Sequence, residues 1–99
     1  MPINAIYEIT KLPMTEILIY SSSICPYCIM AKCLFDQKGM RYTEINVDSA
    51  PGLRKEMMDK TNRRTVPQIY IGDLHVGGFD ELYALDRAKK LDVLLGLYT

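Results

Sequence analysis

A Cys-Pro-Tyr-Cys motif at residues 25–28 stands where an apolar stretch, Ile17 to Tyr20, gives way to a helical pattern. The first backbone N–H groups of a helix are unpaired, and the dipole makes that end positive, so both favour a thiolate at Cys25. Pro26 suits the first helical turn because its missing N–H costs nothing there. Cys28, one turn further in, should stay a protonated thiol that resolves a mixed disulfide formed on Cys25. The spacing therefore indicates a dithiol redox site.

Half of a zinc site is the rival interpretation of two cysteines at this spacing, and it requires a second Cys/His pair. The chain offers only Cys33, on the same helix, and a single histidine, His75. We therefore expect no metal held by protein side chains alone.

Composition bounds the remaining classes. The chain has 99 residues, room for one domain, and its 12 basic and 12 acidic residues cancel, which gives no electrostatic case for nucleic acid or membrane binding. No apolar run approaches the length of a membrane span, and no signal peptide is evident. Three cysteines, two of them in one motif, fit a reducing compartment, so we expect a cytoplasmic protein.

The order of the predicted elements indicates an α/β fold, a four-stranded mixed sheet flanked by helices on both faces. The first two strands should run parallel through a right-handed crossover, and Gly72-Asp73 should turn an antiparallel hairpin between the last two. We predict strands over 16–20, 41–47, 66–71 and 75–77, and helices over 26–38, 51–61, 80–88 and 91–97, with Asp48 or Ser49 capping the second helix and Gly39 ending the first.

Three motifs in register now mark a resemblance: 25–28 (CPYC), 65–71 (TVPQIYI) and 77–82 (GGFDEL). Their order and spacing resemble those of glutaredoxins, members of the thioredoxin superfamily, from Glu16 to about Leu95. The CPYC form is similar to the dithiol class, and to bacterial glutaredoxins that serve ribonucleotide reductase. The resemblance implies a thioredoxin fold.

The resemblance also implies a glutathione groove. The Val66-Pro67 bond should be cis, where Pro67 alone would suggest an ordinary trans bond at the start of a strand. The amides of Phe79 and Asp80 should take the γ-glutamyl carboxylate, and the Asp80 side chain should take the amine. Arg54, in a basic run from 54 to 64, should take the glycyl carboxylate. The residues expected to bind glutathione are Tyr27, Arg54, Thr65, Val66, Pro67, Gly78, Phe79 and Asp80.

Three positions depart from the family pattern. Ser22 stands where many members have a lysine, so the Cys25 thiolate must depend on the helix end and on the Tyr27 and Cys28 amides. Phe79 replaces the cysteine, serine or tyrosine often found there. Asn62 replaces a glycine, but asparagine tolerates left-handed backbone and can still end a helix.

These features predict a glutathione-dependent disulfide oxidoreductase with Cys25 as nucleophile and Cys28 as resolving thiol. We expect no bound cofactor, glutathione as reducing co-substrate, a monomer, and disulfide-containing or glutathionylated proteins as partners, with ribonucleotide reductase among the possible ones and NADPH entering only through glutathione reductase. A glutathione-ligated iron–sulfur module is the alternative, but that role usually accompanies a CGFS motif. A substrate of thioredoxin reductase would have WCGPC, and the chain has no tryptophan.

The remaining residues are expected to have structural roles and no part in the chemistry. The core stripe of the first helix should be Tyr27, Ala31, Leu34, Phe35 and the Lys38 stem, which places Cys33 and Ile29 on the solvent side. His75 should be a surface residue. Residues 1–13 precede every motif, so we expect an extension there and a glutaredoxin domain over 14–99, and we predict that a chain starting at Met14 keeps its activity.

Overall fold

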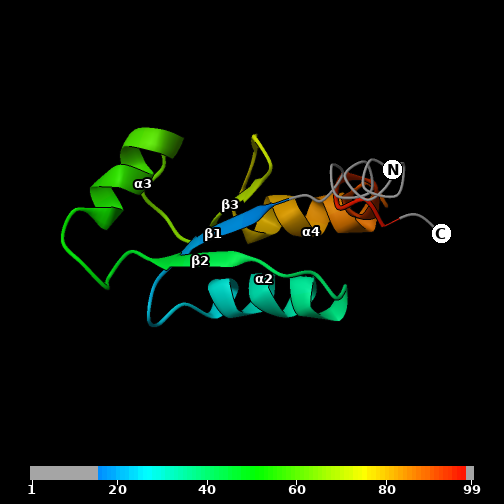
Figure 1. The fold of residues 1–99 in the computed structure, drawn as a ribbon, viewed down its shortest axis with the longest axis horizontal. Coiled ribbons are helices and arrows are strands. Elements are labelled where there is room, and N and C mark those ends of the chain that lie inside the picture. The colour runs from blue at the N-terminus through cyan, green and yellow to red at the C-terminus, as the bar shows by residue number, and fades with distance from the viewer. Residues whose placement is uncertain (1–15, 98–99) are drawn as a thin grey trace, which may run out of the picture.

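A single mixed sheet organises the computed structural model, which describes residues 16–97. Its four strands lie in the order β2-β1-β3-β4, with helices on both faces (Figure 1). The elements are β1 (Ile17–Ser21), α2 (Pro26–Gln37), β2 (Thr43–Asn46), α3 (Leu53–Thr61), β3 (Gln68–Ile71), β4 (Leu74–Gly77), α4 (Phe79–Arg87) and α5 (Leu91–Leu94).

The strand directions confirm the two predicted pairings and add a third, between β1 and β3. β1 pairs parallel with β2 through the α2 crossover and antiparallel with β3, and β3 pairs antiparallel with β4. Gly72 turns that last hairpin with a φ of 58°, a left-handed value that glycine adopts without a steric penalty. The central strands β1 and β3 therefore have a paired strand on each side, while β2 and β4 form the two edges.

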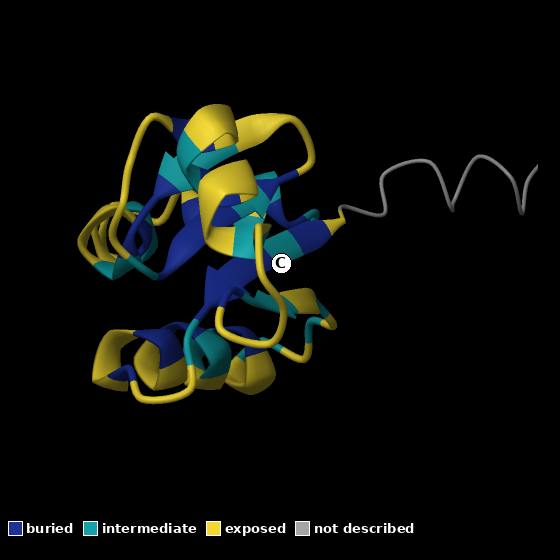
Figure 2. Cartoon of the chain, turned by 90° about the vertical axis from the view of Figure 1, so that its left-hand side faces the viewer, coloured by how far each residue is buried: buried dark blue, intermediate teal, exposed yellow. Residues whose placement is uncertain are grey.

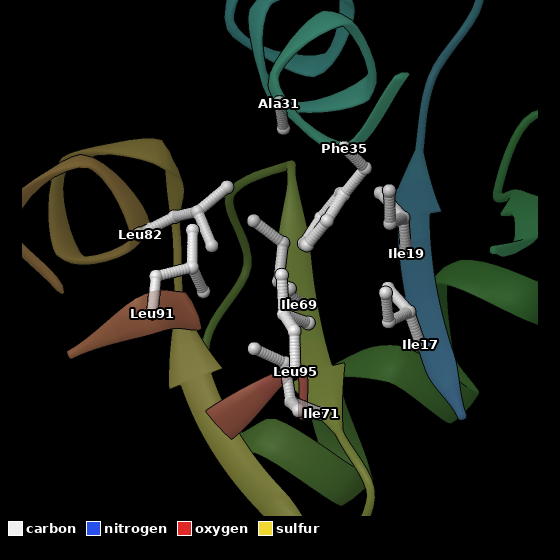
Figure 3. Packing of buried hydrophobic residues seen from close by; sticks show 9 residues of the cluster. All are labelled: Ile17, Ile19, Ala31, Phe35, Ile69, Ile71, Leu82, Leu91 and Leu95. Atoms are coloured by element: carbon white, nitrogen blue, oxygen red, sulfur yellow. The ribbon is translucent and has the colours of Figure 1, made fainter. Parts of the chain in front are cut away.

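One face of the sheet packs against α2, α4 and α5. Side chains from β1 and β3 meet the helices in a single apolar cluster, and Figure 3 shows them pointing toward one another. Phe35 in α2 and Leu82 in α4 are fully buried there, and each such side chain contributes about 1.5 to 3 kcal/mol. The cluster consists of Ile17, Ile19, Ala31, Phe35, Ile69, Ile71, Leu82, Leu91 and Leu95.

The other face packs against α3 through a smaller cluster of Tyr20, Val47 and Met57. Because side chains alternate along a strand, β1 sends Ile17 and Ile19 to one face and Tyr20 to the other. Figure 2 shows the result, with buried residues concentrated in the sheet and exposed ones on the loops and outer helix faces.

Several element boundaries differ from the prediction. α3 begins at Leu53, because Gly52 takes a left-handed φ of 91° and is its N-cap; neither Asp48 nor Ser49 caps it. β2 and β3 are shorter than predicted, since pairing with β1 covers only 43–46 and 68–71. α5 ends at Leu94, short of the predicted 97, and Gly96 follows with a φ of 76°. Gly39 and Asn62 do end α2 and α3 in left-handed backbone, as predicted.

The predicted core stripe of α2 is wrong at Tyr27. Ala31 and Phe35 are fully buried, but Tyr27 is 56% exposed and Cys28 takes the buried place in the first turn. Lys38 pairs through its ammonium with Asp86 and Asp92, at 2.8 and 2.7 Å. Cys33 and Ile29 lie on the solvent side, as predicted.

Within residues 16–97, none of the helices combines the length and apolar character needed to cross a membrane.

Candidate functional site: a dithiol beside a polar pocket

Cys25 is the N-cap residue of α2. Its backbone is extended (φ −155°, ψ 99°), Pro26 begins the helix, and the N–H of Cys28 donates to the Cys25 sulfur across 3.1 Å. A sulfur in this place receives an otherwise unpaired helix donor and the positive end of the dipole. The structure thus places the Cys25 sulfur at the N-terminus of the helix, as the motif predicted.

Cys28 is buried more deeply than Cys25, whose exposed fraction is 8%. Its side chain is 1% exposed, and burial, followed by the neighbouring Cys25, raises its pKa to about 12. A backbone hydrogen bond from Ser22 and the cation of Lys32 act in the lowering direction but do not offset burial. Cys28 is therefore a protonated thiol at neutral pH, which suits a resolving residue and not an attacking one.

The loop before β3 lies against this dithiol. The Val66-Pro67 bond is cis, as predicted, and the Cys25 thiol donates to the carbonyl oxygen of Val66 across 3.7 Å. Val66 also lines a pocket, so the loop connects the Cys25 sulfur to the pocket wall.

That pocket has a volume of about 220 Å³ and a mostly polar lining. It contains every residue predicted to bind glutathione except Arg54. On its rim, the half-exposed ring of Tyr27 stacks against Phe79 with centroids 6.3 Å apart. The lining residues are Tyr27, Arg63, Thr65, Val66, Pro67, Gly78, Phe79, Asp80 and Glu81.

The N-terminus of α4 forms one wall of the pocket. Gly78 is the N-cap, and its N–H donates to Glu81 Oε1 across 2.6 Å, which holds the pKa of Glu81 below its usual value. Phe79 and Asp80 occupy the first turn, one residue earlier than the predicted start at 80. Anions bind well at such a helix end because backbone N–H groups point outward there.

Arg63 and Glu81 are pocket residues that the sequence analysis did not single out. The Arg63 guanidinium lies 3.5 Å from Glu81 Oε1, and both side chains are partly exposed. Two signals were available: Glu81 stands three residues after Gly78, the spacing of a capping box, and Arg63 belongs to the basic run. The run itself did not show which arginine faces the pocket.

Arg54 does not line the pocket. Its guanidinium donates to the backbone oxygen of Arg64 across 3.1 Å and lies 3.6 Å from the Asp48 carboxylate. Its contact with the glycyl carboxylate therefore stays a prediction.

His75 is not the simple surface residue that was predicted. It is half-buried, it stacks on Tyr70 with centroids 4.9 Å apart, and its Nε2 lies 2.7 Å from Gln68 Oε1. In the part of the chain that the structure describes, no three His, Cys, Asp or Glu side chains gather closely enough to hold a metal ion.

Comparisons with known proteins agree with this geometry. Residues 17–76 match the glutaredoxin family model. The chain belongs to the glutaredoxin family. Glutaredoxin from Pseudomonas aeruginosa is 52% identical over 83% of this chain and 98% of its own length, and glutaredoxin 3 from Escherichia coli K12 is 45% identical over 83% and 99%. The crystal structure of a buckwheat glutaredoxin–glutathione complex has a TM-score of 0.77 and 32% identity, and covers 94% of this chain and 88% of that one.

Family membership fixes the general chemistry. The protein is a glutathione-dependent thiol–disulfide oxidoreductase of the thioredoxin fold, with glutathione as reductant. The resemblance drawn from the three motifs is thereby confirmed, and Cys25 and Cys28 lie close together, as a dithiol motif requires.

Proposed function

We propose that this glutaredoxin reduces both glutathione mixed disulfides and protein disulfides, with Cys25 as nucleophile and Cys28 as resolving thiol. The observation that supports this most strongly is the contrast between the two sulfurs. Cys25 receives a helix-end N–H at 3.1 Å, whereas burial keeps Cys28 protonated. Cys25 is therefore placed to attack a substrate disulfide, and Cys28 to react only after a mixed disulfide has formed on Cys25.

Reduction of a glutathione mixed disulfide needs Cys25 alone. The Cys25 thiolate attacks the glutathione sulfur of the substrate, a Cys25–glutathione disulfide forms, and the substrate thiolate leaves and takes a proton. The thiolate of a second glutathione then attacks the glutathione sulfur on Cys25. Glutathione disulfide leaves, and the Cys25 thiolate is restored.

Reduction of a protein disulfide needs both cysteines. Cys25 attacks one sulfur of the substrate and releases the other as a thiolate. Cys28 then loses its proton and attacks Cys25, which releases the second substrate thiol and leaves a Cys25–Cys28 disulfide. Two glutathione molecules reduce that disulfide and leave as glutathione disulfide, so two electrons pass from two glutathiones to the substrate.

The pocket is our proposed site for the glutathione moiety. The Val66 backbone would pair with its cysteinyl part beside Cys25, and the first amides of α4, at Phe79 and Asp80, would take its γ-glutamyl carboxylate. The Asp80 carboxylate would take the amine. Arg63, whose ion pair with Glu81 spans 3.5 Å, adds a cation at the pocket wall for an anionic ligand.

Turnover with the two candidate reducing systems tests the proposal. The protein is given a glutathionylated peptide and then a disulfide-containing protein, with ribonucleotide reductase as the first protein to try. Each substrate is assayed with glutathione, glutathione reductase and NADPH, and separately with thioredoxin reductase and NADPH. We expect NADPH consumption only in the glutathione system. Turnover supported by thioredoxin reductase alone would overturn the proposal.

A further inference from the structure

His75 is connected by hydrogen bonds to the loop that faces Cys25. Its Nε2 lies 2.7 Å from Oε1 of Gln68, whose side chain is fully buried. The Gln68 Nε2 lies 2.9 Å from the Thr65 carbonyl oxygen and 3.3 Å from the Thr65 hydroxyl. One buried amide thus joins the edge strand β4 to the residue that precedes Val66.

The direction of each bond follows from the Thr65 carbonyl. A carbonyl oxygen only accepts, so the Gln68 atom that faces it must be the amide nitrogen. Oε1 of Gln68 then faces His75 and needs a donor. Neutral His75 must therefore carry its proton on Nε2, which leaves Nδ1 without one.

The far end of this connection is the pocket wall. Thr65 and Val66 line the pocket, and the Val66 carbonyl accepts the Cys25 thiol at 3.7 Å. Thr65 itself is exposed, and the hydrogen bonds that the structure gives its side chain and its carbonyl both come from Gln68. The position of this short exposed segment therefore depends on how firmly Gln68 is held.

We propose that His75 is a positioning residue for the glutathione pocket: by fixing the Gln68 amide it holds Thr65 and Val66 in the place that binds the glutathione moiety. The inference rests on the proposed function, since it concerns the same pocket. It assigns His75 an effect on substrate affinity without any contact with the substrate.

The loss of substrate affinity expected without His75 follows from the burial of the Gln68 side chain. When the imidazole donor is removed, Gln68 Oε1 is left without a partner in a site closed to water, and the amide gains by turning or shifting away from Thr65. The chemistry at Cys25 is unchanged, because the Cys28 N–H and the helix end remain. Binding should weaken while the rate of the bound complex stays the same.

Two replacements of His75 whose side chains have similar lengths separate the effect of the hydrogen-bond donor from that of side-chain volume. His75→Gln puts an amide N–H near the place of Nε2, whereas His75→Met fills the space without a donor. We expect His75→Met to raise the KM for a glutathionylated peptide about threefold to tenfold, the range that one lost hydrogen bond gives, with kcat within about twofold. His75→Gln should restore most of the affinity. Asp73→Asn, an exposed change in the same hairpin, is the control and should match the unaltered protein.

A double-mutant cycle separates positioning from general damage. Gln68→Met removes the amide, so adding His75→Met to it should raise KM no further, whereas independent effects would multiply. Equal KM values for His75→Met and the unaltered protein, or a full multiplicative effect in the double variant, would overturn the inference.

Nuclear magnetic resonance of the unaltered protein keeps the test decisive if a variant fails to fold. His75 is the only histidine in the chain, so its ring signals need no assignment by mutation. We expect the neutral ring to be protonated at Nε2, and protonation at Nδ1 would overturn the connection to Gln68. This measurement does not involve turnover, so it also stands apart from the proposed function, which is tested by turnover of the unaltered protein with glutathione and by the cysteine variants.

Discussion

The backbone N–H of Cys28 donates to the sulfur of Cys25 across 3.1 Å, while the Cys28 side chain itself is almost fully buried. The same residue therefore stabilises the attacking sulfur through its main chain and supplies the second thiol through its side chain. A change of the Cys28 side chain leaves the first role in place, which makes the two roles separable by mutation.

Replacing each cysteine with serine should separate the two reactions. Cys25→Ser should abolish both, because no other described thiol occupies the helix end. Cys28→Ser should keep removal of glutathione from a mixed disulfide within about threefold of the unaltered rate, yet lose reduction of protein disulfides, which needs a resolving thiol. The measurement is NADPH consumption coupled to glutathione reductase with each substrate. Equal losses in both variants would contradict the assigned roles.

The raised pKa of Cys28 predicts selective alkylation. In a Cys33→Ser background, which removes the exposed spare thiol, iodoacetamide at about pH 8 should modify Cys25 and spare Cys28, since burial raises the pKa of Cys28 to about 12. Mass spectrometry of peptides after a short exposure gives the extent at each site. Comparable labelling of the two cysteines in the folded protein would show that Cys28 is neither closed to solvent nor fully protonated.

Ser22→Lys should make Cys25 react at lower pH, because a cation placed three residues before it favours the thiolate. The measurement is the midpoint of Cys25 alkylation against pH. Ser22→Met, which has a long side chain without charge, is the matched control and should leave that midpoint in place. A midpoint that does not fall in the lysine variant would show that this position does not face the sulfur.

The free energy of unfolding should decrease as pH is lowered, because His75 becomes protonated. Burial, together with the cation of Arg63, lowers the pKa of His75 from its usual 6.5, against an opposing effect of Glu81; Gln68 and Tyr70 are its neutral neighbours. The stabilising contribution of the neutral ring is therefore complete above 6.5 and is lost as pH falls through the lower folded-state pKa. Urea midpoints measured from about pH 7.5 to about pH 5 should drop more steeply in the unaltered protein than in His75→Gln. Parallel curves would contradict the lowered pKa.

The sequence predicted the sheet, its strand directions and the dithiol, because those depend on local patterns: alternating apolar residues, helix ends and a two-residue gap between cysteines. Left-handed backbone was predictable at Gly39 and Asn62 but missed at Gly52, where Asp48 and Ser49 offered a more familiar cap. A glycine that starts a helix leaves no side-chain signal to read.

Long-range pairing was the part that the sequence could not give. His75 and Gln68 are seven residues apart on two strands, and their bond depends on the register of the β3–β4 pairing, which shifts between Ile69 and Tyr70. Which of Arg54 and Arg63 faces the pocket also depends on long-range packing. Only the packed position of α3 and its following loop decides which guanidinium reaches the pocket.

Gly77 precedes the pocket wall, and a side chain at this position should destabilise the protein. Its φ is 114°, and a Cβ there would lie 2.7 Å from Glu81 Oε1, the oxygen that accepts the Gly78 N–H. Gly77→Ala should lower the free energy of unfolding by about 1 to 3 kcal/mol for the backbone alone, and further because the Glu81 carboxylate must move. Gly72→Ala, at a φ of 58° with no atom within 4 Å of its Cβ, is the control that shows the backbone cost by itself.

Denaturant unfolding should show the larger loss of stability for Gly77→Ala, and adding Glu81→Ala to both glycine variants should narrow the difference between them. Equal losses in the two glycine variants would mean that the Glu81 side chain yields to the methyl group without cost.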